Sequence, residues 1–168
     1  GSTPLRCVLD ACGSLERLWS ADTQGLQQAG ASAQMAQRLV GGRDERLLAK
    51  ELSLAQQHGV TVMTLEDPDY PNSLREIADP PLALYIRGSL PTDEVAVAIV
   101  GSRHASLYGI EPAKRLGYEL AQRRITVVSG LARGIDGASH RGALEAGGLT
   151  VAVLGSGLAD LYPPEHRE

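Results

Sequence analysis

The 168-residue chain has 16 Lys and Arg against 20 Asp and Glu, which gives a formal net charge of −4 at pH 7. This balance argues against a protein that is basic over its whole surface and coats nucleic acid indiscriminately. Aromatic residues make up 4% of the chain and Phe is absent, so we expect an aliphatic core in one large domain or two small ones.

Residues 1–58 are predicted to form a helical N-terminal domain. Glycines interrupt its apolar pattern and mark helix ends. Helices are expected over residues 4–11, 14–19, 22–29, 31–40 and 43–57. The last helix carries a mostly one-sided apolar stripe, which we expect to join the same small bundle. The stripe consists of Leu47, Leu48, Leu52, Leu54 and Ala55.

Residues 59–94 are predicted to be a connecting segment with strands over residues 60–65 and 82–86. A brief helix over residues 73–77 should stop before Asp79, because the residue before a proline is pushed out of helical angles. We expect both strands to attach to the domain that follows them, residues 95–168.

From Val95 onward, strands alternate with helices. Strands are predicted over residues 95–100, 125–128 and 150–154, and helices over residues 109–123 and 136–146. Pro112 is expected in the first turn of the first of these helices. The strand ends lie 28 and 26 residues apart, close to the roughly 30 residues of a βαβ unit. The pattern predicts an α/β fold with a doubly wound parallel sheet.

Cys7 and Cys12 are the two cysteines, and without a second pair they are expected to be buried thiols rather than zinc ligands. No apolar run is long enough to span a membrane, and no charged start followed by a hydrophobic segment suggests export. We therefore expect a cytoplasmic protein without a membrane partner.

A glycine-bearing turn follows each strand of the predicted parallel sheet, at residues 101–103, 129–137 and 155–157. The carboxyl ends of parallel strands share one edge, where ligands of open α/β sheets bind. Backbone N–H groups, serine hydroxyls and the Arg103 guanidinium suit phosphate oxygens. Tight turns without a ligand are the alternative reading.

The expected phosphate contacts come from the first two turns: Gly101, Ser102, Arg103, Ser129, Gly130, Arg133 and Gly134. Arg103 is favoured because it directly follows a buried strand, whereas Arg133 is equally well explained as a solvated loop residue. Asp136 is expected to cap the next helix and His140 to be a packed or hydrogen-bonded histidine. Four residues are expected to support the pocket: Asp136, His140, Gly155 and Gly157.

No catalytic residue, metal or cofactor is expected. Ser129 has no local base to activate it, and neither paired carboxylates nor a metal-ligand cluster lies near the turns. The first turn reads GSRHAS instead of G-x-G-x-x-G, and Ser129 stands where a dinucleotide site needs an acid. These departures argue against a dehydrogenase.

Several blocks together resemble the DprA/Smf family (DNA-processing protein A): IVGSR, VVSGLARGID with Ser139-His140 close behind, and TVAVLGSGLADLYP. Residues 67–88, DPDYPNSLREIADPPLALYIRG, are similar to the segment between the family's helical and Rossmann-like domains. The N-terminal helices are similar to its sterile-alpha-motif-like or helix-hairpin-helix-like module. The resemblance covers nearly the whole chain and implies a Rossmann-like domain over residues 95–168.

The resemblance implies a non-catalytic protein that binds single-stranded DNA in natural transformation, protects incoming strands and helps to load the recombinase RecA. The family's phosphate pocket maps onto Gly101, Ser102 and Arg103, with residues 129–134 beside it. A net +4 within residues 101–141, against −8 elsewhere, also suits a groove that tracks a strand. The alternative is an enzyme that binds or hydrolyses nucleotides in the same pocket. A third reading makes the N-terminal helices a module for protein or duplex binding.

Two departures from the family pattern affect these expectations. Pro164 and Glu165 follow Tyr162-Pro163, where family members often place a lysine or arginine. That contact is expected to be missing, or to come from His166 or Arg167. The chain also stops at Glu168, so the resemblance implies a fragment without the later parts to which homodimerisation and RecA contacts are assigned.

Overall fold

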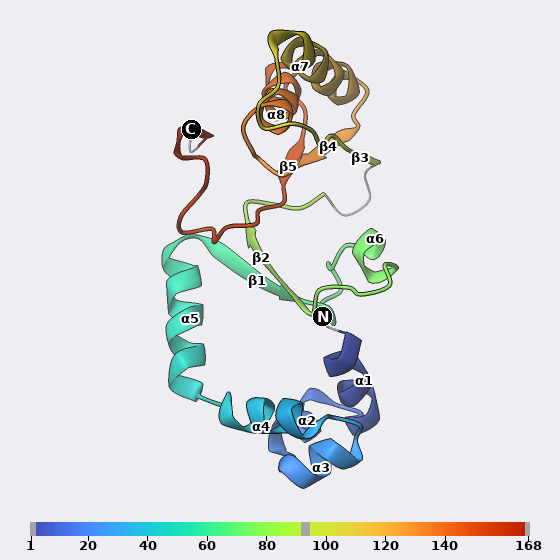
Figure 1. Ribbon diagram of the computed structural model, residues 1–168, viewed down its shortest axis with the longest axis vertical. Helices are drawn as coiled ribbons and strands as arrows, with labels where there is room; N and C mark the ends of the chain where they lie inside the picture. Colours follow the sequence, from blue (N-terminus) through green and yellow to red (C-terminus); the bar gives the residue numbers. More distant parts are fainter. Residues whose placement is uncertain (1–2, 92–94, 167–168) are drawn as a thin grey trace. The chain divides into compact units, whose positions relative to one another are not determined.

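The computed structural model describes residues 3–91 and 95–166, and contacts divide the chain into one unit up to Ile86 and a second from Arg87 (Figure 1). The first unit opens with five helices, as predicted: α1 (Thr3–Cys12), α2 (Leu15–Ser20), α3 (Thr23–Gln28), α4 (Ala33–Gly41) and α5 (Glu45–Gln57). Four of them begin with a side-chain cap, because Ser14, Asp22, Ser32 and Asp44 accept hydrogen bonds from first-turn N–H groups.

The core of this helical group is made by α1 to α4, with Val8, Leu18 and Leu26 among its buried side chains. Helix α5 has no buried residue and packs against β1 (Val60–Thr64) instead. The leucines of its predicted apolar stripe are exposed: Leu47, Leu48, Leu52 and Leu54. The prediction that this stripe packs into the bundle is therefore wrong. Cys7 is also exposed rather than buried.

Strand β1 pairs with β2 (Ala83–Arg87), and the short α6 (Asn72–Arg75) lies between them in sequence. Tyr70 fills the interior of this segment and donates a hydrogen bond to the Pro81 carbonyl at 2.9 Å. Contacts group the segment as far as Ile86 with the helices before it. This grouping differs from the prediction that both strands attach to the following domain.

The second unit contains the predicted parallel sheet, with strands in the order β3 (Ala96–Ala98), β4 (Thr126–Ser129) and β5 (Thr150–Ala152). Helices α7 (Leu107–Gln122) and α8 (Ile135–Glu145) pack against each other on one side of the sheet (Figure 1). A 3-10 turn, Pro164–His166, follows β5.

Helix α7 begins two residues earlier than predicted, so Pro112 lies inside it rather than in its first turn. At this position proline supplies no N–H for the helical hydrogen bond to the Tyr108 carbonyl. Ser106 precedes the helix, and its side chain makes no capping hydrogen bond.

Glycines allow α7 and α8 to approach closely. A Cβ on Gly142 would lie 1.9 Å from the Lys114 carbonyl oxygen, and one on Gly117 would lie 2.3 Å from that of Ser139. Beneath the two helices lies an aliphatic core that includes Ile99, Val127 and Ala143, as the composition predicts.

The buried carboxylate of Asp136 ties the ends of β3 and β4 to the start of α8. Its Oδ1 accepts a hydrogen bond from the Gly101 N–H at 3.2 Å, and its Oδ2 accepts one from the Gly130 N–H at 3.1 Å. Helix α8 starts at Ile135 with Gly134 at the cap position, where no side chain caps it. The predicted capping role of Asp136 is therefore wrong, because its side chain reaches the two strand ends instead.

Replacement of Gly142 by Ala should lower the free energy of unfolding by about 1–3 kcal/mol, because the added methyl group would overlap the backbone of α7. Gly41→Ala is the control, since no heavy atom lies within 4 Å of its Cβ position. Urea denaturation should give Gly142→Ala a lower free energy of unfolding than Gly41→Ala. Equal stabilities would contradict the close packing of the helices.

The Asp136→Asn variant should lose roughly 2 kcal/mol or more of its free energy of unfolding. The amide oxygen can accept from only one of the Gly101 and Gly130 N–H groups, and the amide NH₂, itself a donor, would face the other. Asp44→Asn is the matched control. One oxygen of Asp44 accepts both of its hydrogen bonds, from Arg46 and Leu47, and Asn caps helices as well as Asp does. Urea denaturation measures both variants, and equal losses would contradict this role of Asp136.

Candidate functional site

The carboxyl ends of β3, β4 and β5 lie at the same edge of the sheet, which we call the strand-end edge. Residues 101–103 and 129–135 contact each other there, since the Ile135 N–H donates to the Ser102 carbonyl at 3.2 Å. Gly134 has a φ of 78°, and a Cβ on it would lie 2.2 Å from the Ser102 oxygen. Both its conformation and this contact require glycine. Parallel pairing thus brings the first two predicted turns together.

Three of the predicted phosphate contacts are already used inside the protein. The N–H groups of Gly101 and Gly130 donate to Asp136, whose carboxylate takes the place expected for a bound anion. The Ser129 hydroxyl is buried and donates to the Ile99 carbonyl at 2.5 Å. These residues build the edge from inside, and their contact with phosphate stays a prediction.

Arg103 and Ser102 are exposed on the first turn. The Ser102 hydroxyl accepts a hydrogen bond from the His104 N–H at 3.1 Å, which tightens this turn. Within residues 3–91 and 95–166, the Arg103 side chain has no hydrogen-bond or ion-pair partner. Its planar guanidinium is therefore free to bind an anion through two parallel hydrogen bonds.

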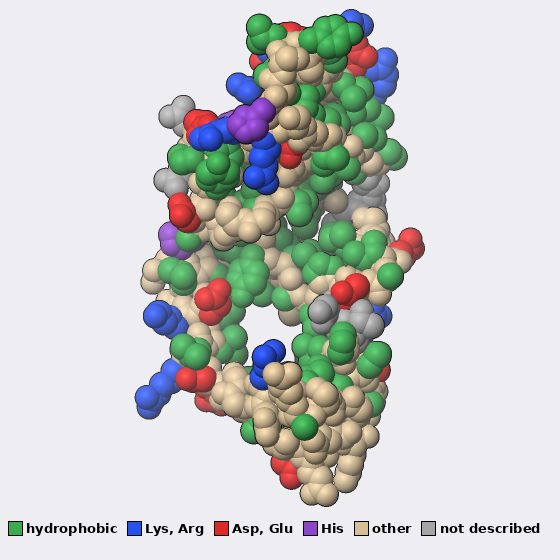
Figure 2. All heavy atoms as spheres, viewed as in Figure 1, with side chains coloured by type: hydrophobic (Ala, Val, Ile, Leu, Met, Phe, Trp, Pro, Cys, Tyr) green, Lys and Arg blue, Asp and Glu red, His purple; other side chains and the backbone are tan. Residues whose placement is uncertain are grey.

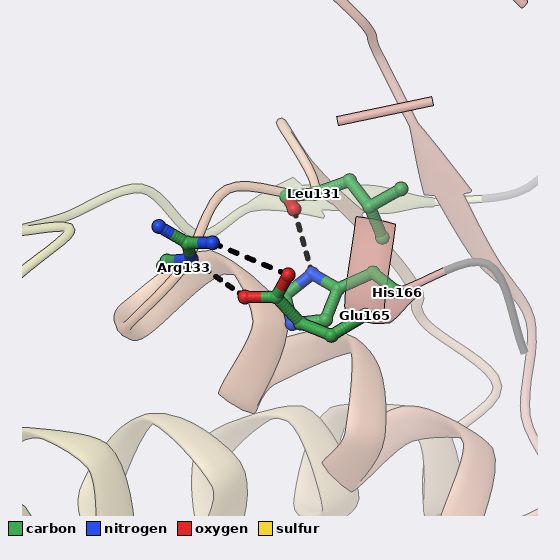
Figure 3. Close-up of polar contacts among 4 residues, drawn as sticks. All are labelled: Leu131, Arg133, Glu165 and His166. Atoms are coloured by element: carbon green, nitrogen blue, oxygen red, sulfur yellow. Dashed lines mark hydrogen bonds and ion pairs between the residues drawn. The ribbon is translucent and has the colours of Figure 1, made fainter. Parts of the chain in front are cut away.

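Arg133, on the second turn, is held by a residue that follows β5 (Figure 3). Its Nε lies 2.6 Å from Oε1 of Glu165, and its Nη2 lies 3.3 Å from Oε2. The guanidinium also lies 5.6 Å from the centroid of the Tyr162 ring. Hydrogen bonds, first from the Arg133 side chain and then from the backbone N–H of Glu165 itself, lower the pKa of Glu165 to about 2. Arg133 is thus paired with Glu165 on a side chain that is half exposed.

His166 fixes the same C-terminal segment against the second turn. Its Nδ1 lies 2.9 Å from the Leu131 carbonyl oxygen (Figure 3). Its ring also packs on α8 so closely that a Cβ on Gly137 would lie 2.5 Å from it. His166 was one of two candidates for the family's basic contact; the other, Arg167, lies outside the described residues.

The sequence did not predict the pairing of Arg133 with Glu165, because a contact between residues 32 positions apart leaves no periodic signal.

His140 is buried in α8 and hydrogen-bonded to β5, in agreement with the expected packed histidine. The Thr150 hydroxyl donates to the Val127 carbonyl at 2.8 Å, so it accepts from His140 Nδ1 at 2.6 Å. Burial lowers the pKa of His140, and the nearby charge of Asp136 partly opposes this shift. The hydrogen bond to Thr150 joins α8 to β5.

The third turn is less closely packed than the first two. No heavy atom lies within 4 Å of a Cβ position at Gly155 or Gly157. The link to the second turn comes earlier, where the Val153 N–H donates to the Ser129 carbonyl at 2.8 Å. The role of Gly155 and Gly157 in supporting a pocket stays a prediction.

Part of the basic surplus of residues 101–141 lies on α7 and is paired with glutamates of α7 and α8. Lys114 lies 2.8 Å from Glu145, and Arg115 lies 2.8 Å from Glu119. On the face shown in Figure 2, basic and acidic side chains are interspersed. Among the described residues no group of three or more His, Cys, Asp and Glu could hold a metal ion, and no described helix could cross a membrane.

Comparison with known proteins gives the chain a family. A family model described as DNA recombination-mediator protein A matches residues 61–168. Protein Smf of Synechocystis is 36% identical over 160 residues, which cover 92% of this chain and 40% of that protein. DprA of Streptococcus pneumoniae is 41% identical over 102 residues, or 60% of this chain and 36% of that protein. The chain thus spans about two fifths of the length of these relatives.

Two solved structures are similar. DNA processing protein A from Streptococcus pneumoniae has a TM-score of 0.80 and 28% identity, over 99% of this chain and 57% of that one. The second is DNA processing protein A from Helicobacter pylori, which was studied for its single-stranded DNA binding mode. It has a TM-score of 0.54 and 29% identity, over 64% of this chain and 49% of that one. The Rossmann-like fold and the predicted relationship are confirmed: the chain belongs to the DNA recombination-mediator protein A family, which includes Smf and DprA.

Proposed function

We propose that this chain binds single-stranded DNA through backbone phosphates at the strand-end edge, with Arg103 as the principal direct contact. The unpaired, exposed guanidinium of Arg103 carries the proposal, since it lies on a turn that Gly134 and Ile135 hold in place. The similar protein from Helicobacter pylori, described by its binding of single-stranded DNA, supports it. Phosphate recognition of this kind is independent of base sequence.

Two groups that could serve catalysis near this edge, Asp136 and His140, are used for structure. The Asp136 carboxylate accepts hydrogen bonds from two strand ends, and His140 is buried with Nδ1 bonded to Thr150. Neither is positioned to activate a nucleophile for a nucleotide at the edge. These contacts favour a DNA-binding protein over the alternative, a nucleotide-binding or nucleotide-hydrolysing enzyme. A nucleotide panel that produced turnover would overturn this choice.

The wider role that we propose follows the family. The protein would protect incoming single strands in natural transformation and assist the loading of RecA in the cytoplasm. Contacts with RecA and with a second copy of the protein would involve parts of the longer relatives beyond the two fifths that this chain spans. Bound DNA in this role has to be released again, so moderate affinity at each phosphate contact suits it.

Replacement of Arg103 by Ala should weaken the binding of single-stranded oligonucleotides by about 5-fold or more, whatever their sequence. One lost phosphate contact should also reduce the slope of log K against log salt by about 0.7–1. Fluorescence anisotropy of labelled oligonucleotides at several salt concentrations measures both effects.

Arg115→Ala is the matched control, because it removes the same charge from α7, where Arg115 is paired with Glu119. It should change affinity and slope much less than Arg103→Ala does. Equal effects of the two variants would mean that Arg103 contributes only its positive charge and no direct phosphate contact, which would overturn the proposal.

A further inference from the structure

Glu165 is an anion bound by an arginine of the strand-end edge. The two oxygens of its carboxylate face Nε and Nη2 of Arg133, at 2.6 and 3.3 Å. Arginine binds phosphate with the same parallel geometry, so a carboxylate and a phosphate oxygen pair compete for the same donors. A phosphate cannot form these two hydrogen bonds with Arg133 while Glu165 holds them.

The pair is built so that it can open without disturbing the fold. The Arg133 and Glu165 side chains are 51% and 50% exposed, so water can solvate each of them after separation. The chain remains anchored before and after Glu165, because Pro163, two residues earlier, is buried and His166 is bonded to the Leu131 carbonyl. Only side chains need to rotate, and the carboxylate stays close enough to return.

From this geometry we infer that Glu165 is an internal competitor of DNA: it occupies the phosphate site of Arg133 in the free protein, and a backbone phosphate displaces it. The inference rests on the proposed function and adds a residue that sets the affinity of the edge. Arg103, which has no partner among the described residues, offers the first contact, and Arg133 joins when Glu165 leaves. Glu165 thereby weakens binding without contacting DNA.

The Glu165→Gln variant tests the inference with the full chain and fluorescein-labelled oligo(dT). Removal of the competing charge should tighten binding by about 2- to 5-fold, the range expected when an exposed ion pair no longer has to be broken. Glu119→Gln is the matched control, since it removes the same charge from another exposed Arg–Glu pair, on α7. Circular dichroism should show that both variants remain folded.

A double-mutant cycle isolates the pair. Arg133→Ala should weaken binding, and the gain from Glu165→Gln should disappear in the Arg133→Ala background. Equal affinities of Glu165→Gln and Glu119→Gln, or weaker binding by Glu165→Gln, would overturn the inference, because Glu165 would then be neutral or would position Arg133 for DNA.

The outcome also separates this inference from the function on which it rests. If the wild-type chain binds oligo(dT), Arg103→Ala weakens binding and Glu165→Gln matches Glu119→Gln, only the competitor role of Glu165 fails. If neither the wild-type chain nor Glu165→Gln binds oligo(dT), both the proposed function and the inference fail.

Discussion

A single buried carboxylate, that of Asp136, joins three parts of the second unit that are distant in sequence: the end of β3, the end of β4 and the first turn of α8. Backbone N–H groups at strand ends need a partner when they are removed from water. Asp136 supplies one partner for two of them, and thereby fixes the turns that carry Arg103 and Arg133. The candidate phosphate contacts at the surface therefore depend on an anion inside the protein.

Asp136 and Glu165 both occupy places where an external anion was expected, but the two carboxylates differ in burial and therefore in how easily each can leave its partners. Asp136 is 6% exposed, and removal of its carboxylate would leave the N–H groups of Gly101 and Gly130 without the partner that joins them. Glu165 is half exposed, and water can take over both sides of its ion pair. The first carboxylate is a permanent part of the fold, whereas the second can be exchanged for a phosphate.

Local patterns in the sequence predicted the order and type of the helices and strands, since caps, glycines and apolar periodicity act over a few residues. They failed where a residue's partner is distant. The predicted capping role of Asp136 fails because the sequence of a helix start is the same whether its aspartate bonds its own helix or a turn 35 residues away. The stripe on α5 has bundle-like spacing, although the helix packs against β1 and leaves its leucines exposed. The exposed position of Arg103 was predictable from its place after an apolar strand, but the expected burial of that strand is wrong: in β3 Ala96 and Ala98 are exposed, and only Ile99, which follows the strand, is buried.

The small residues between α7 and α8 have an entropic consequence. Buried positions of α7 are Ala113, Gly117 and Ala121, and those of α8 include Ala138, Gly142 and Ala143. Side chains of this size have no rotamers to lose, so the two helices gain close backbone contact with little loss of side-chain conformational entropy. The free energy of this interface therefore comes from dispersion and the release of water, and little of it is offset by side-chain ordering.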